Sequence, residues 1–117
     1  MFRVIIAGSR SFDDYALLKK KADLYLSNIK DEIRVVCGLA RGADTLGEKY
    51  ARERGYDVDY YPADWTNLGK AAGYVRNEQM ARNADALIAF WDGESVGTAH
   101  MITLSRKYNL PIRIVRY

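Results

Sequence analysis

The chain has 117 residues, of which 49% are hydrophobic and 28% are charged, and this balance suits one folded domain and excludes a disordered or fibrous protein. Its longest apolar run, Ala86–Trp91, is far shorter than the roughly 20 residues that a membrane helix needs. Because the first residues have the pattern of a strand rather than of a leader, we expect a cytoplasmic domain without a membrane anchor.

Charge and the scarcity of metal ligands narrow the function classes further. Lys and Arg number 18 against 15 Asp and Glu, and the net charge of +3 gives a weak preference for anions. A dedicated nucleic-acid binder carries a more basic stripe than this. The single cysteine, Cys37, excludes an internal disulfide, and Cys37 and His100 alone cannot build a zinc site. We therefore expect no metal and no required cofactor, an inert buried Cys37 and a structural or peripheral His100.

Short apolar runs, most of them ending at a glycine or proline, alternate with segments of helical spacing, except that the segment 71–84 is polar and is predicted as a helix from its many helix formers. In chain order, the pattern predicts a strand over 2–7, a helix over 13–28, a strand over 33–37, a helix from 43 to a stop at Gly55, a strand over 58–61, a helix over 71–84, a strand over 86–91, a helix over 97–108 and a strand over 112–115. The first helix is predicted to bury Leu18, Ala22, Tyr25 and Ile29. The last is predicted to carry Met101, Leu104, Ser105 and Tyr108 on one side.

This alternation of strands and helices defines the expected fold class. Strands joined by helices imply right-handed crossovers and a parallel sheet that is covered on both faces. The continuous apolar segments 4–7 and 86–91 support this fold, because strands that are buried on both faces of a sheet consist almost entirely of apolar residues. We predict one α/β domain over residues 1–117, a Rossmann-like three-layer fold whose parallel sheet has about five strands.

The residues that a plain scaffold would not need fall directly after four of the predicted strands. They lie in the segments 8–10, 38–44, 63–65 and 92–98. In a parallel sheet these loops share the carboxyl edge, where open α/β folds bind their ligands. Glycines there let the backbone approach a ligand, and a helix that starts directly afterwards offers free N–H groups to an anion.

The chemistry of these loops favours a phosphate or pyrophosphate. The hydroxyls of Ser9 and Thr98 and the charges of Arg10, Arg41, Lys70 and Arg76 are the candidate donors. The glycine spacing fits neither GxGxxG nor GxxxxGK[ST], so it does not support familiar NAD or ATP binding. Plainer interpretations stay open, because each glycine can be a simple turn and Ser9 or Thr98 a helix cap.

Two further residues draw attention to the same edge. Trp65 lies in a polar loop, where an aromatic ring either stacks on a base or packs at the sheet boundary. Arg76 is expected in the first turn of the helix over 71–84, on one side with Gln79, Met80 and Asn83, and directed toward the ligand edge.

The motifs together resemble the YspA-like family of the SLOG superfamily, which also groups the DprA/Smf DNA-processing proteins and the LOG cytokinin-activating enzymes. The resemblance runs from Val4 to about Pro111 and rests on VIIAGSR (4–10), CGLARGAD (37–44), YPADW (61–65), GKAAGYVRNEQM (69–80) and DGESVGTAH (92–100). It implies a Rossmann-like sheet with a site for nucleotides or nucleotide-derived ligands. By position, it implies as ligand residues Gly8, Ser9, Arg10, Gly38, Arg41, Gly42, Asp44, Arg76, Asn77, Gly97 and Thr98. Our interpretation of the loops adds Asp64, Trp65, Lys70 and Gly93.

One departure from the LOG pattern bears on catalysis. LOG enzymes carry PGGxGTxxE with a catalytic glutamate, whereas His100 and Met101 stand here where the acidic pair would lie. An N-glycosidic hydrolase would have to recruit another carboxylate, and the candidates are Asp44, Glu78, Asp92 and Glu94.

The leading hypothesis is therefore a binding module or sensor for a phosphorylated small molecule of the nucleotide type. The alternative is a LOG-like hydrolase of nucleoside monophosphates, so whether the chain is an enzyme stays open. Binding of single-stranded DNA, as in DprA, is a weaker alternative because the charge excess is small. Self-association stays open as well.

Overall fold

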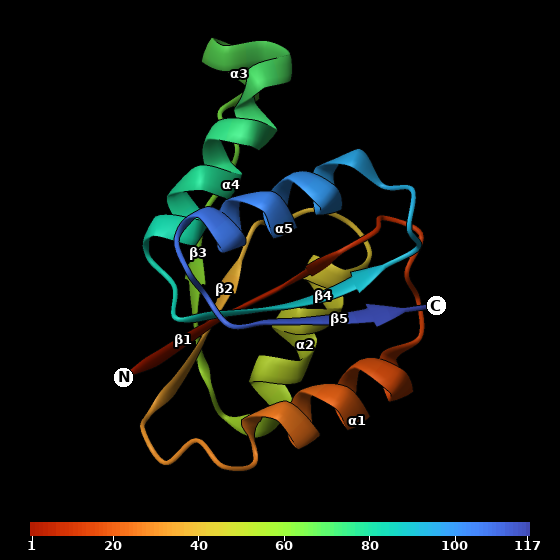
Figure 1. Cartoon of the computed structure of the whole chain (residues 1–117), viewed down its shortest axis with the longest axis vertical. Coiled ribbons are helices and arrows are strands. Elements are labelled where there is room, and N and C mark those ends of the chain that lie inside the picture. The colour runs from red at the N-terminus through yellow and green to blue at the C-terminus, as the bar shows by residue number, and fades with distance from the viewer.

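A computed structural model describes residues 1–117 and contains one five-stranded sheet with the strand order β3-β2-β1-β4-β5 (Figure 1). All four strand pairs are parallel. The strands are β1 (Phe2–Gly8), β2 (Ile33–Cys37), β3 (Asp57–Tyr60), β4 (Ala86–Trp91) and β5 (Ile112–Arg116). The predicted parallel α/β sheet is confirmed.

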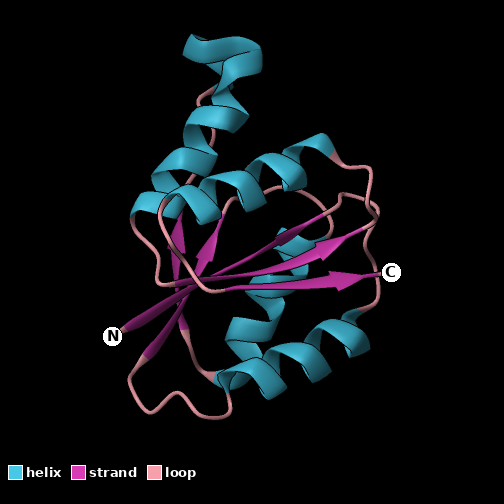
Figure 2. Ribbon diagram, in the orientation of Figure 1, coloured by secondary structure: helices cyan, strands magenta, loops and turns pink.

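Helices cover both faces of this sheet, which gives three layers (Figure 2). The helices are α1 (Tyr15–Leu26), α2 (Ala43–Arg54), α3 (Trp65–Leu68), α4 (Ala72–Arg82) and α5 (Val96–Lys107), with a 3₁₀ turn at Gly69–Ala71. One hydrophobic core lies between the sheet and α1 and α2, and the second lies between the sheet and α4 and α5. Every helix falls short of the length and apolarity that crossing a bilayer would require.

The central strand β1 shows why the sheet is buried on both faces. Val4 and Ile6 point into the core under α1 and α2, whereas Ile5 points into the core under α4 and α5. All three are 0% exposed, as the two-residue period of a strand between two helical layers requires.

The ends of several elements differ from the sequence prediction for local reasons. Helix α1 begins at Tyr15, because the Asp14 carboxylate accepts a hydrogen bond from Leu17 N (3.0 Å) and caps it there. Its third buried position is Leu26, whereas Tyr25 and Ile29 are only partly buried. In α5, by contrast, Met101, Leu104 and Ser105, which were predicted on one side, are all buried, and Tyr108 directly after the helix is partly buried.

The short helix α3 was not predicted. It has four residues and buries none of them, so it leaves no apolar periodicity in the sequence. The Asp64 carboxylate caps it by accepting a hydrogen bond from Asn67 N at 3.2 Å. Figure 1 shows α3 projecting beyond the sheet at the start of α4.

Candidate functional site

A cleft of about 420 Å³ opens at the carboxyl edge of the sheet, between the loops that follow β1 and β4. The strand order reverses between these two strands, and ligands of open α/β sheets bind at this kind of switch point. We call it the switch-point cleft. Its polar lining consists of Gly8, Ser9, Arg10, Ser11, Asp44, Arg76, Asn77, Asp92, Ser95, Gly97 and Thr98.

The loop after β1 is held close to α2 by two glycines. A Cβ on Gly8 would lie 2.9 Å from the Cβ of Ala43, so no larger residue fits there. Gly42 caps α2 with a φ of 80°, and a Cβ there would lie 2.7 Å from the Arg10 carbonyl oxygen. Gly42 therefore supports the loop and does not itself line the cleft.

The buried Ser9 connects this loop to the one after β4, because Asp92 N donates a hydrogen bond to Ser9 Oγ (3.2 Å). The Asp92 carboxylate in turn accepts from Glu94 N (2.9 Å) and Ser95 N (2.8 Å). These backbone donors lower the pKa of Asp92. Its charge is thus used to hold the turn that leads into α5.

The beginning of α5 faces the cleft. Ser95 caps the helix, with its Oγ 3.5 Å from Thr98 N and 3.1 Å from Thr98 Oγ1. A Cβ on Gly97 would meet nothing within 4 Å, so the wall of the cleft is open at this residue. The free N–H groups and the positive end of the helix dipole are therefore available to an anion.

Arg76 and Asn77 connect α4 to two of the loops. Arg76 Nη1 donates to the Gly38 carbonyl oxygen and Nε donates to Asn77 Oδ1 (3.0 Å). Asn77 Nδ2 donates to the Gly97 carbonyl oxygen (3.4 Å) and lies 3.2 Å from His100 Nδ1. Burial lowers the pKa of Arg76, although the charge of Asp44 acts in the opposite direction. Arg76 takes part in none of the ion pairs of the structure.

The predicted place of Arg76 in its helix was wrong. Helix α4 begins at Ala72, so Arg76 lies in the second turn and not in the first. Gln79 and Asn83, expected on the same side, are exposed. The inward side carries Asn77 and Met80 beside the half-buried Arg76, because α5 packs on that side of α4.

Asp44 is a buried acid at the floor of the cleft and is only 5% exposed. Its Oδ2 accepts from Ala40 N at 3.4 Å. Burial raises the pKa of Asp44 to about 6, although the charges of Arg76 and Arg10 act in the opposite direction. Because Gly38 has no side chain, acid and cation both approach it: a Cβ there would lie 2.8 Å from Asp44 Oδ2 and 2.9 Å from Arg76 Nη1.

A second hollow of about 250 Å³ adjoins the switch-point cleft and shares Arg10, Ala40 and Arg76 with it. We call it the Trp65 hollow. It contains the other predicted ligand residues that the structure brings near the cleft, namely Gly38, Arg41 and Trp65.

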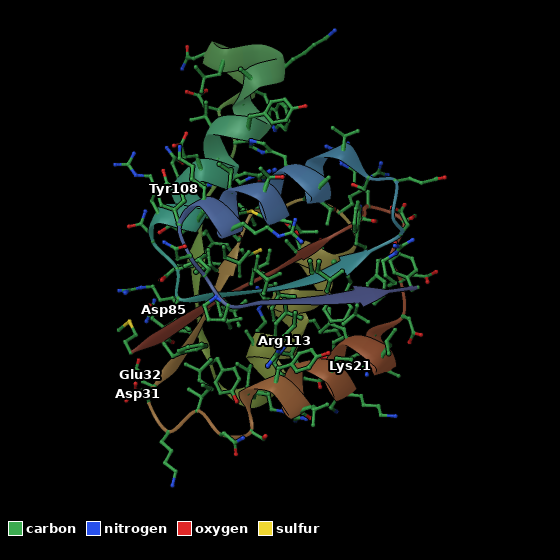
Figure 3. All side chains as sticks on the ribbon, viewed as in Figure 1. Lys21, Asp31, Glu32, Asp85, Tyr108 and Arg113 are labelled. Atoms are coloured by element: carbon green, nitrogen blue, oxygen red, sulfur yellow. The ribbon has the colours of Figure 1, made fainter.

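The remaining candidates lie elsewhere. Asp64 caps α3, Lys70 is exposed in the 3₁₀ turn, and Gly93 has a φ of 86° and faces the Arg116 guanidinium. Glu94 is exposed. Glu78 accepts from the hydroxyl of Tyr108 (2.9 Å), which follows the last residue of α5 (Figure 3), and neither residue lines the cleft. Asp44 and Asp92 are therefore the two carboxylate candidates that line the cleft.

Sequence reasoning overlooked two residues that line the cleft, Ser95 and Ser11. The predicted helix began at Gly97, whereas α5 begins at Val96; with the correct start, the preference for serine before a helix would have indicated Ser95.

Cys37 is buried as predicted, and burial raises its pKa to about 11. No group of three or more His, Cys, Asp or Glu side chains is placed to hold a metal ion.

The parallel sheet, its covering helices and the polar cleft at its switch point define a Rossmann-like α/β domain. The chain belongs to the YspA, cpYpsA-related SLOG family, whose model (YAcAr) matches residues 2–67, more than half of the chain. It is 37% identical over 118 residues to the Gene 61 protein of Mycobacterium phage D29, a match that covers 96% of this chain and 94% of the relative. The family resemblance seen in the sequence is thus confirmed.

Solved structures with the same fold include two DNA processing proteins. DprA from Streptococcus pneumoniae superposes with a TM-score of 0.73 at 15% identity and covers 97% of this chain, which spans 49% of that protein. TM1055 superposes with a TM-score of 0.70 at 20% identity, over 96% of this chain and 72% of that one. DprA from Helicobacter pylori, solved for its single-stranded DNA binding mode, has a TM-score of 0.63 at 20% identity. The superposition covers 97% of this chain and 64% of that one.

Proposed function

We propose that the switch-point cleft binds a phosphorylated small molecule of the nucleotide or nucleotide-derived class, and that the chain is a binding module or sensor. The observation that carries this proposal is the convergence of Arg10, Arg76 and the open start of α5 on one cleft at the switch point of the sheet. Phosphate oxygens accept hydrogen bonds from guanidinium groups and from helix N-termini.

The electrostatics of the cleft support an anion. A half-buried guanidinium without a direct carboxylate partner is unfavourable, and the lowered pKa of Arg76 reflects this cost. Neither cleft carboxylate supplies the missing partner. The Asp92 carboxylate accepts from the backbone after β4. The charge of Asp44 partly offsets the cost by raising the pKa of Arg76, but Asp44 forms no ion pair with it. A bound phosphate would place negative charge between Arg10 and Arg76.

Calorimetric titration with ADP and pyrophosphate tests the proposal. Arg76→Ala and Arg10→Ala should each weaken binding about tenfold to a hundredfold, which is the usual contribution of a charge-assisted hydrogen bond to affinity. Arg76→Lys should restore only part of the affinity, because the planar fork is lost. Arg82→Ala is the matched control, since Arg82 is an exposed arginine of the same helix outside the cleft. The proposal fails if the wild type binds neither probe, or if both cleft variants bind as the wild type does.

Hydrolysis of the N-glycosidic bond of a nucleoside monophosphate is the second candidate, and Asp44 favours it. A buried carboxyl group with a pKa of about 6 in the ligand cleft has the properties of a general acid or base. Incubation with the four common nucleoside monophosphates, followed by chromatography of the free bases, distinguishes the two functions. Release of base that is lost in Asp44→Asn would replace the binding-only proposal, which expects none above background.

Binding of single-stranded DNA is the third candidate, supported by the fold shared with Helicobacter pylori DprA. Its signature is affinity that falls steeply as salt rises, because each neutralised phosphate releases counterions. A thermal-shift comparison of oligonucleotides and mononucleotides at two salt concentrations separates this function from small-ligand binding.

A further inference from the structure

The Trp65 hollow differs in chemistry from the cleft beside it. Its lining combines the apolar side chains of Leu39, Pro62, Ala63 and Trp65 with a cationic part, the guanidinium groups of Arg10, Arg41 and Arg76. Leu39 and Trp65 are 50% and 53% exposed, so two large apolar side chains that line a positively charged hollow are accessible to solvent. A ligand with one flat apolar part and one anionic part fits such a hollow.

The ring of Trp65 lies close to the cationic side. Trp65 Cη2 is 3.5 Å from the point where a Cβ of Gly73 would be, and Arg76 Nη2 is 3.8 Å from the same point. Since Gly73 has no side chain, nothing from this position fills the space between ring and guanidinium. The aromatic surface thus adjoins the arginine that also lines the switch-point cleft.

The backbone at Leu39 fixes another part of the apolar lining of the hollow. Leu39 has a φ of 63°, a left-handed conformation that is unfavourable for leucine. Leu39 N donates to Cys37 Sγ (3.4 Å), and the neighbouring Ala40 N donates to Asp44 Oδ2 (3.4 Å). The turn is therefore anchored to buried residues, and it keeps the apolar side chain of Leu39 exposed beside the hollow.

We infer that the Trp65 hollow is the subsite for the base of a nucleotide whose phosphate occupies the switch-point cleft. This inference rests on the proposed function and extends it from a phosphate site to a two-part site. The base stacks on Trp65, the sugar crosses at Ala40 and Arg76, which belong to both hollows, and the phosphate reaches Arg10. Stacking on tryptophan accepts every base, since each has a flat π-face.

Calorimetric titration with ADP and with pyrophosphate, which lacks a base, separates the two parts. Trp65→Ala should weaken ADP binding about 10- to 100-fold, the range measured for base–aromatic stacking, and leave pyrophosphate binding unchanged. Trp65→Phe should retain most of the ADP affinity. Leu68→Ala is the matched control, because Leu68 is 42% exposed on the same short helix and lines neither hollow. It should change neither affinity.

The outcomes distinguish a failure of this inference from a failure of the proposed function. ADP binding that is no tighter than pyrophosphate binding, or unchanged in Trp65→Ala, would refute the base subsite while the phosphate site stands. Loss of both ligands in Trp65→Ala would also refute it, because the ring would then act structurally. If the wild type binds neither ligand, the phosphate site itself is wrong and the subsite falls with it.

Discussion

Replacement of Asp44 by asparagine should stabilise the ligand-free protein, and increasingly so as the pH rises. Burial raises the pKa of Asp44 from 3.8 to about 6. A carboxyl group with a raised pKa in the folded state destabilises that state once it ionises. This penalty is absent below about pH 4, where the carboxyl is protonated in both states, and complete above about pH 6. The uncharged amide of the Asp44→Asn variant would carry no such penalty.

The magnitude follows from the size of the shift. At about 1.4 kcal/mol per pKa unit, the rise from 3.8 to about 6 corresponds to roughly 3 kcal/mol of unfolding free energy. About 2 kcal/mol of this develops between pH 4.5 and pH 7.5, because part of the penalty is already present at the lower value. Asp44 is only 5% exposed, so solvent screens this effect little.

Urea denaturation of both proteins at several pH values measures the effect. The quantity of interest is the unfolding free energy of Asp44→Asn minus that of the wild type, since the other titrating groups cancel in this difference. It should rise with pH. For Asp92→Asn, the same difference in unfolding free energy should fall as the pH rises. The lowered pKa of Asp92 means that its ionised carboxylate stabilises the folded state, and the asparagine variant lacks this stabilisation. A difference for Asp44→Asn that stays flat within about 0.5 kcal/mol, or falls with pH, would refute the reasoning.

Three substitutions test other parts of the structure. Gly97→Val should leave the unfolding free energy within about 0.5 kcal/mol of the wild type, because a Cβ there meets nothing within 4 Å. The same variant should weaken pyrophosphate binding in calorimetry. Normal binding would show that the start of α5 is not part of the site. Gly47→Ala should destabilise the protein by about 1–3 kcal/mol in urea, because the new Cβ would lie 2.8 Å from Ile6 Cγ2; an unchanged midpoint would contradict this packing. Leu18→Ala should cost about 2–5 kcal/mol in the same assay, because Leu18 is 0% exposed between α1 and the sheet, and a loss below 1 kcal/mol would argue against that core.

Most strands and longer helices could be predicted because apolar periodicity reports burial directly, whereas α4 could be predicted only from its helix-forming residues. The continuous run Ala86–Trp91 became a central strand, and Gly42 followed by Ala43 correctly marked the start of α2. Helix α3 escaped prediction because its formation depends on a cap and not on burial. Sequence pattern detects elements that bury a face or are rich in residues favouring their conformation, and it misses a short helix such as α3 that has neither feature.

The membership of the cleft was harder to predict than its position. Arg76 and Glu78 are two residues apart, but successive residues of a helix are rotated by about 100°, so the two side chains leave α4 on opposite sides. Arg76 therefore reaches Gly38, whereas Glu78 reaches Tyr108. Similarly, the turn after β4 directs Asp92 toward the cleft and leaves Glu94 exposed. These directions depend on element boundaries, which sequence patterns locate only approximately.

The pair Arg76 and Asn77 has a consequence for the kinetics of association. Through hydrogen bonds to the carbonyl oxygens of Gly38 and Gly97, one step of α4 braces the loop after β2 against the start of α5 before any ligand arrives. A ligand that enters so preorganised a cleft loses little free energy to the ordering of loops. Its association rate should then be set by diffusion and by the attraction of the arginines, while discrimination between ligands resides in the rate at which each one leaves.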